Sequence, residues 1–232
     1  MTGSADRGVA GESARREYER RTKRDERRVL QQKADIHARW GDGLLGRFVA
    51  AVTVDDTPRS RTTVWAVGAA GEETVAAMLD SIETGTALHD RKIPGSRANI
   101  DHIFVSPRGV WVVDAKKYVG KRPRLSHEGG VFGFGGTERL RIAGRASDRL
   151  VDGVLGQAQL VTAALGHSVP VSAALCFVDA DWPLFGGAFT VQGVFVGSPK
   201  MLRKRLTSQE GDEPVIDVDW ASARLARMLP SA

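Results

Sequence analysis

The stretch of sequence that most constrains the fold is NIDHIFVSPRGVWVVDAKK, residues 99–117. It reads as two apolar strands joined by the four-residue turn SPRG, which has proline second and glycine fourth, as a type I turn prefers. Such a turn fixes the register of the hairpin and pairs Val105 with Val110. The same register brings Asp101 opposite Asp114. The sequence therefore predicts an antiparallel hairpin in which two carboxylates are neighbours.

Facing carboxylates repel each other, and apolar strands around them make hydration harder to keep. A divalent cation would remove the conflict, since Mg²⁺ prefers oxygen ligands and needs only one or two carboxylates besides water. Lys116 lies two residues after Asp114, hence on the same strand face, whereas His102 lies on the other face and is expected in the core. A simpler interpretation is a strand-end ion pair between Lys116 and Asp114, with Asp101 capping a loop. We expect a metal site, because these charged residues border apolar strand segments.

Two predicted helices add polar side chains on their apolar faces. The periodicity of GAAGEETVAAMLDSI, residues 68–82, predicts a helix with Glu72 on that face. A later helix should begin after Ser147 and carry Gln157, whose amide either supports the site or bonds to backbone. Further apolar strands and a last amphipathic helix give the order helix, three strands, helix, two strands, helix. This order predicts an α/β domain.

The N-terminal part has a different character. Residues 1–11 are small and polar, as in a mobile tail, and residues 12–39 favour a helix without an apolar stripe. That helix carries ten Lys or Arg against six Asp or Glu. Mixed signs allow i, i+4 pairing in a solvated helix, and a DNA-contacting arm is the alternative. We therefore assign residues 1–60 to a tail and charged helical extension, and residues 61–232 to one domain.

Composition limits the remaining possibilities. The single Cys176 excludes an internal disulfide and a Cys-rich zinc site, and no apolar stretch reaches membrane-spanning length. The N-terminus lacks the hydrophobic segment of a signal peptide, so we expect a cytoplasmic protein without membrane association. The formal charge is +5. Basic residues that follow the hairpin could track a phosphate backbone or lie in a solvated loop: Lys117, Lys121, Arg122 and Arg124.

These motifs resemble the nuclease-related domain (NERD) family, which is grouped with the PD-(D/E)XK, or restriction-endonuclease-like, superfamily. The resemblance runs from about residue 68 to about residue 165. It rests on GAAGEETVAAML, on NIDHIFVSPRGVWVVDAKKYVGK and on the glutamine of VLGQAQLV. It implies a restriction-endonuclease-like core with a mixed central sheet flanked by helices. Asp114 is a departure, because the family more often has glutamate before the Ala-Lys pair.

The resemblance also implies an active site made of Glu72, Asp101, Asp114 and Lys116, with Gln157 in support. Asp101 and Asp114, together with Glu72, would hold one or two Mg²⁺ or Mn²⁺ ions, while Lys116 would orient or help to deprotonate the attacking water. We expect a metal-dependent nuclease that hydrolyses phosphodiester bonds, with DNA as its partner. The alternative is a non-catalytic nucleic-acid-binding or scaffold module with the same fold. The oligomeric state is left open.

Overall fold

The computed structural model describes residues 6–40, 60–96, 98–129, 136–183, 187–208 and 216–232. The chain divides into two compact units. One unit joins Met1–Glu12 to Ala70–Ala232, and the other consists of Ser13–Ala69. The long helix α1 (Glu12–Trp40) confirms the predicted charged helix and belongs almost wholly to the second unit. The domain boundary near residue 60 stays a prediction, and α3 begins at that residue.

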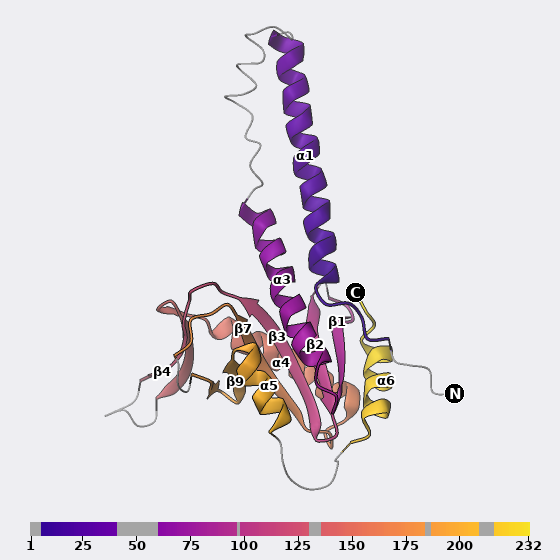
Figure 1. Ribbon diagram of the computed structural model, residues 1–232, viewed down its shortest axis with the longest axis vertical. Coiled ribbons are helices and arrows are strands. Elements are labelled where there is room, and N and C mark those ends of the chain that lie inside the picture. Colours follow the sequence, from indigo (N-terminus) through magenta and orange to yellow (C-terminus); the bar gives the residue numbers. More distant parts are fainter. Residues whose placement is uncertain (1–5, 41–59, 97, 130–135, 184–186, 209–215) are drawn as a thin grey trace. The chain divides into compact units, whose positions relative to one another are not determined.

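A mixed sheet of six strands forms the centre of the first unit, in the order β1-β2-β3-β7-β9-β8 (Figure 1). The strands β1, β2 and β3 are antiparallel neighbours, whereas β3 pairs with β7, and β7 with β9, in parallel. A parallel pair needs a crossover connection, which contains α4 here. The predicted mixed sheet of a restriction-endonuclease-like core is confirmed. The strand bounds are β1 (Thr86–Lys92), β2 (Asn99–Ser106), β3 (Gly109–Lys117), β7 (Val171–Val178), β8 (Phe189–Val191) and β9 (Val194–Gly197).

Helices cover both faces of this sheet. Because side chains alternate along a strand, β3 contributes to two separate cores. Val113 shares one core with Leu79 of α3, and Val112 shares the other with Val154 of α4 and Leu225 of α6. Asp114 and Lys116 follow Val112 with the strand period, so they belong to the α4 side. The helices are α3 (Ser60–Asp80), α4 (Asp148–Leu165), α5 (Pro199–Thr207) and α6 (Val218–Met228).

The hairpin of β2 and β3 has the predicted register. Val105 lies opposite Val110, and the ladder continues to His102 opposite Val113. Gly109 closes the turn with a φ of 142°, and a Cβ at this position would lie 2.8 Å from the carbonyl oxygen of Pro170. A side chain at that position would therefore clash. The positive φ and the close approach of Pro170 both require glycine here, and this glycine fixes the turn and with it the register.

A second, antiparallel sheet of three strands precedes α4. It consists of β4 (Pro123–Glu128), β5 (Thr137–Ile142) and β6 (Arg145–Ala146). The predicted helix after Ser147 is α4, although the Ser147 side chain makes no capping hydrogen bond. Asp148 instead joins the helix to β5, because its carboxylate accepts hydrogen bonds from Arg139 at 2.6 Å and from the amide of Leu140 at 3.2 Å.

Residues 6–12, here called the N-terminal strap, lie along the outer edge of β1. The amide of His89 donates to the carbonyl of Arg7 at 2.7 Å. Gly8 has a φ of 67°, and a Cβ there would lie 2.1 Å from the carbonyl oxygen of His89. The sequence predicted a mobile tail over residues 1–11, but residues 6–11 are held by these contacts, and residues 1–5 lie outside the described part.

The C-terminal residues reach the same edge strand. The amide of Lys92 donates to the carbonyl of Pro230 at 2.8 Å. Residues before α1 and residues after α6 therefore protect the edge of the sheet, which would otherwise expose unpaired backbone groups. None of the described helices has the length and hydrophobicity required to cross a lipid bilayer.

Candidate active site

The two aspartates of the hairpin lie just beyond the last ladder pair of β2 and β3. Asp101 Oδ2 accepts a hydrogen bond from the amide of Ala115 at 2.9 Å. The carboxyl groups of Asp101 and Asp114 lie close enough to influence each other electrostatically. Burial, and after it the charge of Asp114, raises the pKa of Asp101 well above its ordinary value. The structure thus brings the predicted carboxylate pair together in a partly dehydrated place.

Lys116 supplies the positive charge beside this pair. Its Nζ forms an ion pair with Asp114 Oδ1 and lies 3.4 Å from the carbonyl oxygen of Ala115. Burial alone would lower the pKa of Lys116, but the charges of Asp114, Asp101 and Glu72 outweigh burial and raise it. The amine is therefore an ammonium at neutral pH, which suits it to stabilise negative charge and makes it a poor proton acceptor.

Glu72 enters the site from the start of the part of α3 that belongs to the first unit. The amide of Gly11, in the N-terminal strap, donates a hydrogen bond to its carboxylate. Burial, followed by the charge of Asp90, raises the pKa of Glu72 to about 7, against the opposing effect of Lys116. Gly71 permits this approach, because a Cβ there would lie 3.0 Å from Cβ of Lys117 on β3.

Gln157 lies on α4, close to the beginning of β2. Its Nε2 donates to the carbonyl of Asn99 at 3.5 Å. Its Oε1 is buried and has no hydrogen-bond partner in the described part of the chain. The structure therefore shows the backbone contact that the sequence left open, and it leaves Oε1 as an unused acceptor. The supporting role of Gln157 stays a prediction.

The four basic residues predicted to contact nucleic acid differ in their surroundings. Lys117 pairs with Asp179 at 3.1 Å, and Arg122 pairs with Asp181 at 2.7 Å. The ammonium of Lys121 lies 5.5 Å from the centre of the Tyr118 ring. Arg124 is exposed on β4 and forms no ion pair with a described side chain. Two of these cations are thus already neutralised by neighbouring aspartates.

The sequence analysis missed Asp90, which lies on the edge strand next to the site. Its side chain is buried, its φ is 48°, and its Oδ1 accepts a hydrogen bond from Asn99 Nδ2 at 2.8 Å. Its charge contributes to the raised pKa of Glu72. A signal was present in the run His89-Asp90-Arg91, since three consecutive polar residues put polar side chains on both faces of the strand.

A buried histidine pair lies on the opposite face of the hairpin. His89 Nδ1 is 3.0 Å from His102 Nδ1, and His89 Nε2 is 3.3 Å from Asp80 Oδ1. His102 is fully buried, which confirms its predicted place in the core. Burial lowers the pKa of both rings. The pairing itself could not be seen in the sequence, because it joins neighbouring strands.

The donor groups of the site fit a hard divalent cation. Asp101 and Asp114 offer neighbouring carboxylate oxygens, which are the ligands that such a cation prefers. Zinc would prefer nitrogen or sulfur ligands, and Cys176 is buried in the core on the other face of the sheet. Within the described residues, no three His, Cys, Asp or Glu side chains form a group able to hold a metal. The pair of aspartates is thus the donor set, with Glu72 beside it.

Comparison with known families agrees with this geometry. Residues 67–178 match the family described as nuclease-related domain. Neither the curated proteins nor the solved structures contain a match to this chain. The matched span holds Glu72, the whole β2-β3 hairpin and Gln157. Residues 67–178 of this chain are therefore similar to the nuclease-related domain family.

Proposed function

We propose that this domain is a metal-dependent nuclease that hydrolyses phosphodiester bonds in DNA. The observation that carries the proposal is the placement of Asp101 and Asp114 side by side at the end of the β2-β3 ladder, with the ammonium of Lys116 paired to Asp114. A sheet gains no stability from two carboxylates in contact. A buried cluster of carboxylates with one ammonium is typical of a site that binds cations and phosphates.

Asp101 and Asp114 would hold Mg²⁺ or Mn²⁺, and a bound ion would supply Lewis-acid polarisation of a phosphoryl oxygen. The side chains of the chain do the remaining work. The ammonium of Lys116, beside Asp114, would stabilise the negative charge that develops on the phosphoryl group. Glu72, with its pKa of about 7, exchanges a proton readily near neutral pH and is suited to accept one from the attacking water.

The remaining polar groups would position the substrate. The unpartnered Oε1 of Gln157 can accept a hydrogen bond from water or from Lys116. Lys121 and Arg124 are exposed cations that could contact phosphates, whereas Lys117 and Arg122 would first have to leave their aspartates. A cytoplasmic location, expected from the sequence, belongs to the same proposal.

The test is a cleavage assay with the purified full-length chain on single-stranded, duplex and branched DNA, with Mg²⁺, with Mn²⁺ and with EDTA. Lys116→Ala and Asp114→Asn should each reduce the rate by roughly 10²-fold or more. Two exposed residues outside the site provide matched controls, Lys204→Ala on α5 and Asp219→Asn on α6, which should cleave like the wild type.

Cleavage that persists unchanged in Lys116→Ala and Asp114→Asn would assign the activity to another site or to a contaminant. Cleavage of RNA alone would refute the choice of DNA. Salt-sensitive DNA binding without turnover under any metal condition would instead support the non-catalytic binding module.

A further inference from the structure

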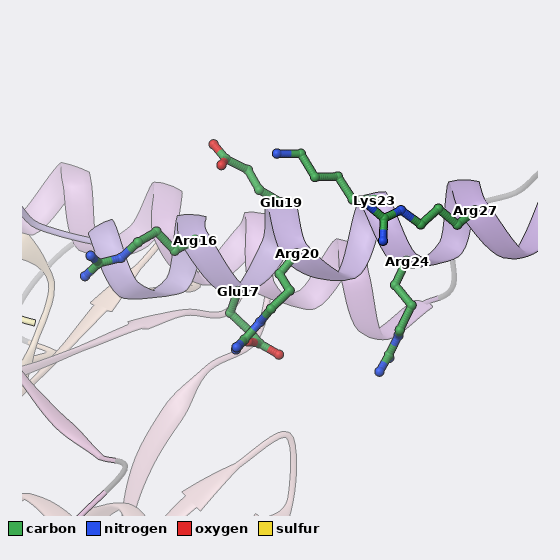
Figure 2. A pocket seen from close by; sticks show the side chains of 7 residues that line it. All are labelled: Arg16, Glu17, Glu19, Arg20, Lys23, Arg24 and Arg27. Carbon is green, nitrogen blue, oxygen red and sulfur yellow. The ribbon is translucent and has the colours of Figure 1, made fainter.

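Five cationic side chains lie along one side of α1, within the unit formed by Ser13–Ala69 (Figure 2). An α-helix turns by about 100° per residue, so these five positions fall within an arc of about 100°. They span roughly 16 Å of the helix axis, at a rise of about 1.5 Å per residue. Glu17 and Glu19 border the arc on its two sides. We call this set the α1 basic stripe: Arg16, Arg20, Lys23, Arg24 and Arg27.

Three of the five cations of the stripe form no ion pair with the side chains that the structure describes. Arg20 pairs with Glu17. By contrast, Lys23, Arg24 and Arg27 are exposed and form no ion pair with any described side chain. In Figure 2, Lys23 and Arg24 extend beyond the ribbon on opposite sides, and Arg27 lies across it. With five cations and two acids around one open hollow, the stripe carries an excess of positive charge on a rigid element.

The chemistry of this surface selects a polyanion with repeated phosphates. Duplex DNA carries one negative charge per about 1.7 Å of its axis, so a stripe of this length faces several phosphates. Guanidinium groups bind phosphate oxygens through two parallel hydrogen bonds. An anionic lipid surface is a poorer match, because Tyr18 is the one aromatic or aliphatic residue between Arg16 and Arg27 and membrane-surface helices need an apolar face.

We propose that the α1 basic stripe binds the phosphate backbone of DNA and holds it for the nuclease-related domain. The choice of DNA rests on the function proposed above. Contacts of this kind position a substrate and read no bases, so the stripe should raise affinity equally for all sequences. This gives the charged helix a role that its mixed composition left open.

The test measures DNA binding by the full-length chain in EDTA, so that cleavage does not interfere. The triple variant Lys23→Gln, Arg24→Gln, Arg27→Gln removes three exposed cations, and glutamine keeps a high helix propensity. Fluorescence anisotropy with a labelled duplex is recorded from 50 to 200 mM NaCl, and circular dichroism checks the helix. We expect affinity at the lowest salt to fall at least roughly tenfold, and the slope of log K against log salt to lose about three units.

A matched control removes the same charge elsewhere. The triple variant Lys200→Gln, Lys204→Gln, Arg205→Gln changes three exposed cations of α5 and should bind DNA like the wild type. Equal losses in both triple variants would overturn the proposal, because total charge would then explain binding. Loss of binding to anionic vesicles, with DNA binding unchanged, would overturn it in favour of a membrane partner.

The outcome is separable from that of the nuclease proposal. Stripe-dependent DNA binding by a chain that never cleaves would uphold the stripe and refute the nuclease. Metal-dependent cleavage, together with DNA affinity that is unchanged in the stripe variant, would uphold the nuclease and refute the stripe. Each assay thus decides its own question.

Discussion

Replacing Asp101 with asparagine should stabilise the metal-free protein and abolish its response to Mg²⁺. Asparagine keeps an oxygen that can accept the hydrogen bond from Ala115, and its amide can donate to Asp114. The wild-type carboxyl has a pKa well above its ordinary value, first because of burial and then because of Asp114. Each pKa unit of such a shift corresponds to about 1.4 kcal/mol against the ionised form at neutral pH.

The expected gain in stability follows from removing this buried carboxyl group. Relief of a strained functional site commonly contributes about 0.5–2 kcal/mol, which in a chain of this length raises Tm by about 1–8 °C. Mg²⁺ should stabilise the wild type but not the variant. At a concentration one hundred times Kd, a cation bound by the native state alone adds about 2.7 kcal/mol to the wild type, and it should add nothing to the variant.

Thermal unfolding in EDTA and in a Mg²⁺ titration measures both parts. Asp219→Asn is the matched control, since this exposed aspartate on α6 lies outside the site and should leave both readings unchanged. The reasoning is refuted if Asp101→Asn melts below the wild type in EDTA and Mg²⁺ stabilises both proteins equally. That result would mean that the carboxylates do not repel each other and do not share a cation.

Three further predictions follow from the surroundings of single side chains. Gly71→Ala should reduce cleavage by roughly 10- to 100-fold through displacement of Glu72. The free energy of unfolding of this variant should change little, because the gain in helix propensity, about 1 kcal/mol, offsets the crowding against β3. Urea unfolding measures this. Burial lowers the pKa of both His89 and His102, so each ring should stay neutral in the folded protein at pH values where a free histidine is protonated. An NMR titration of the imidazole protons in EDTA measures this, and a ring that gains its proton at 6.5 or above would contradict it. Burial raises the pKa of Cys176 to about 12, so a thiol reagent at pH 8 should label it only after unfolding, and labelling of the native protein would disprove its burial.

The hairpin could be predicted because its determinants are local. A proline and a glycine in the turn and the alternation of apolar residues fix which residues of β2 and β3 face each other, and the structure has that register. The same alternation placed Asp101 and Asp114 together and His102 on the other face. Helical periodicity placed Glu72 toward the sheet, although α3 starts at Ser60, eight residues before the predicted helix.

The parts that escaped prediction depend on contacts between distant segments. Nothing near Gly11 indicates that its amide will meet the carboxylate of Glu72, because the strap has no periodicity that assigns it to an edge strand. The polar run around Asp90 looked like a solvated edge, and only the strap and the C-terminal residues show that it is covered. The raised pKa of Lys116 could not be predicted either, because it depends on carboxylates from three elements, while the role of Lys116 stays a prediction.

The buried guanidinium of Arg91 connects segments from the beginning and the end of the first unit. Its nitrogens donate to the carbonyls of Leu229 at 2.6 Å, Ala226 at 3.1 Å and Asp6 at 2.9 Å. During synthesis on the ribosome, the strap is made first, and the full set of Arg91 hydrogen bonds can therefore form only after α6 has been made. We expect a growing polypeptide to be unable to cut DNA until that late stage, which would protect nucleic acid from nascent chains. A chain shortened to begin near residue 60 lacks the strap and would therefore also lack these hydrogen bonds.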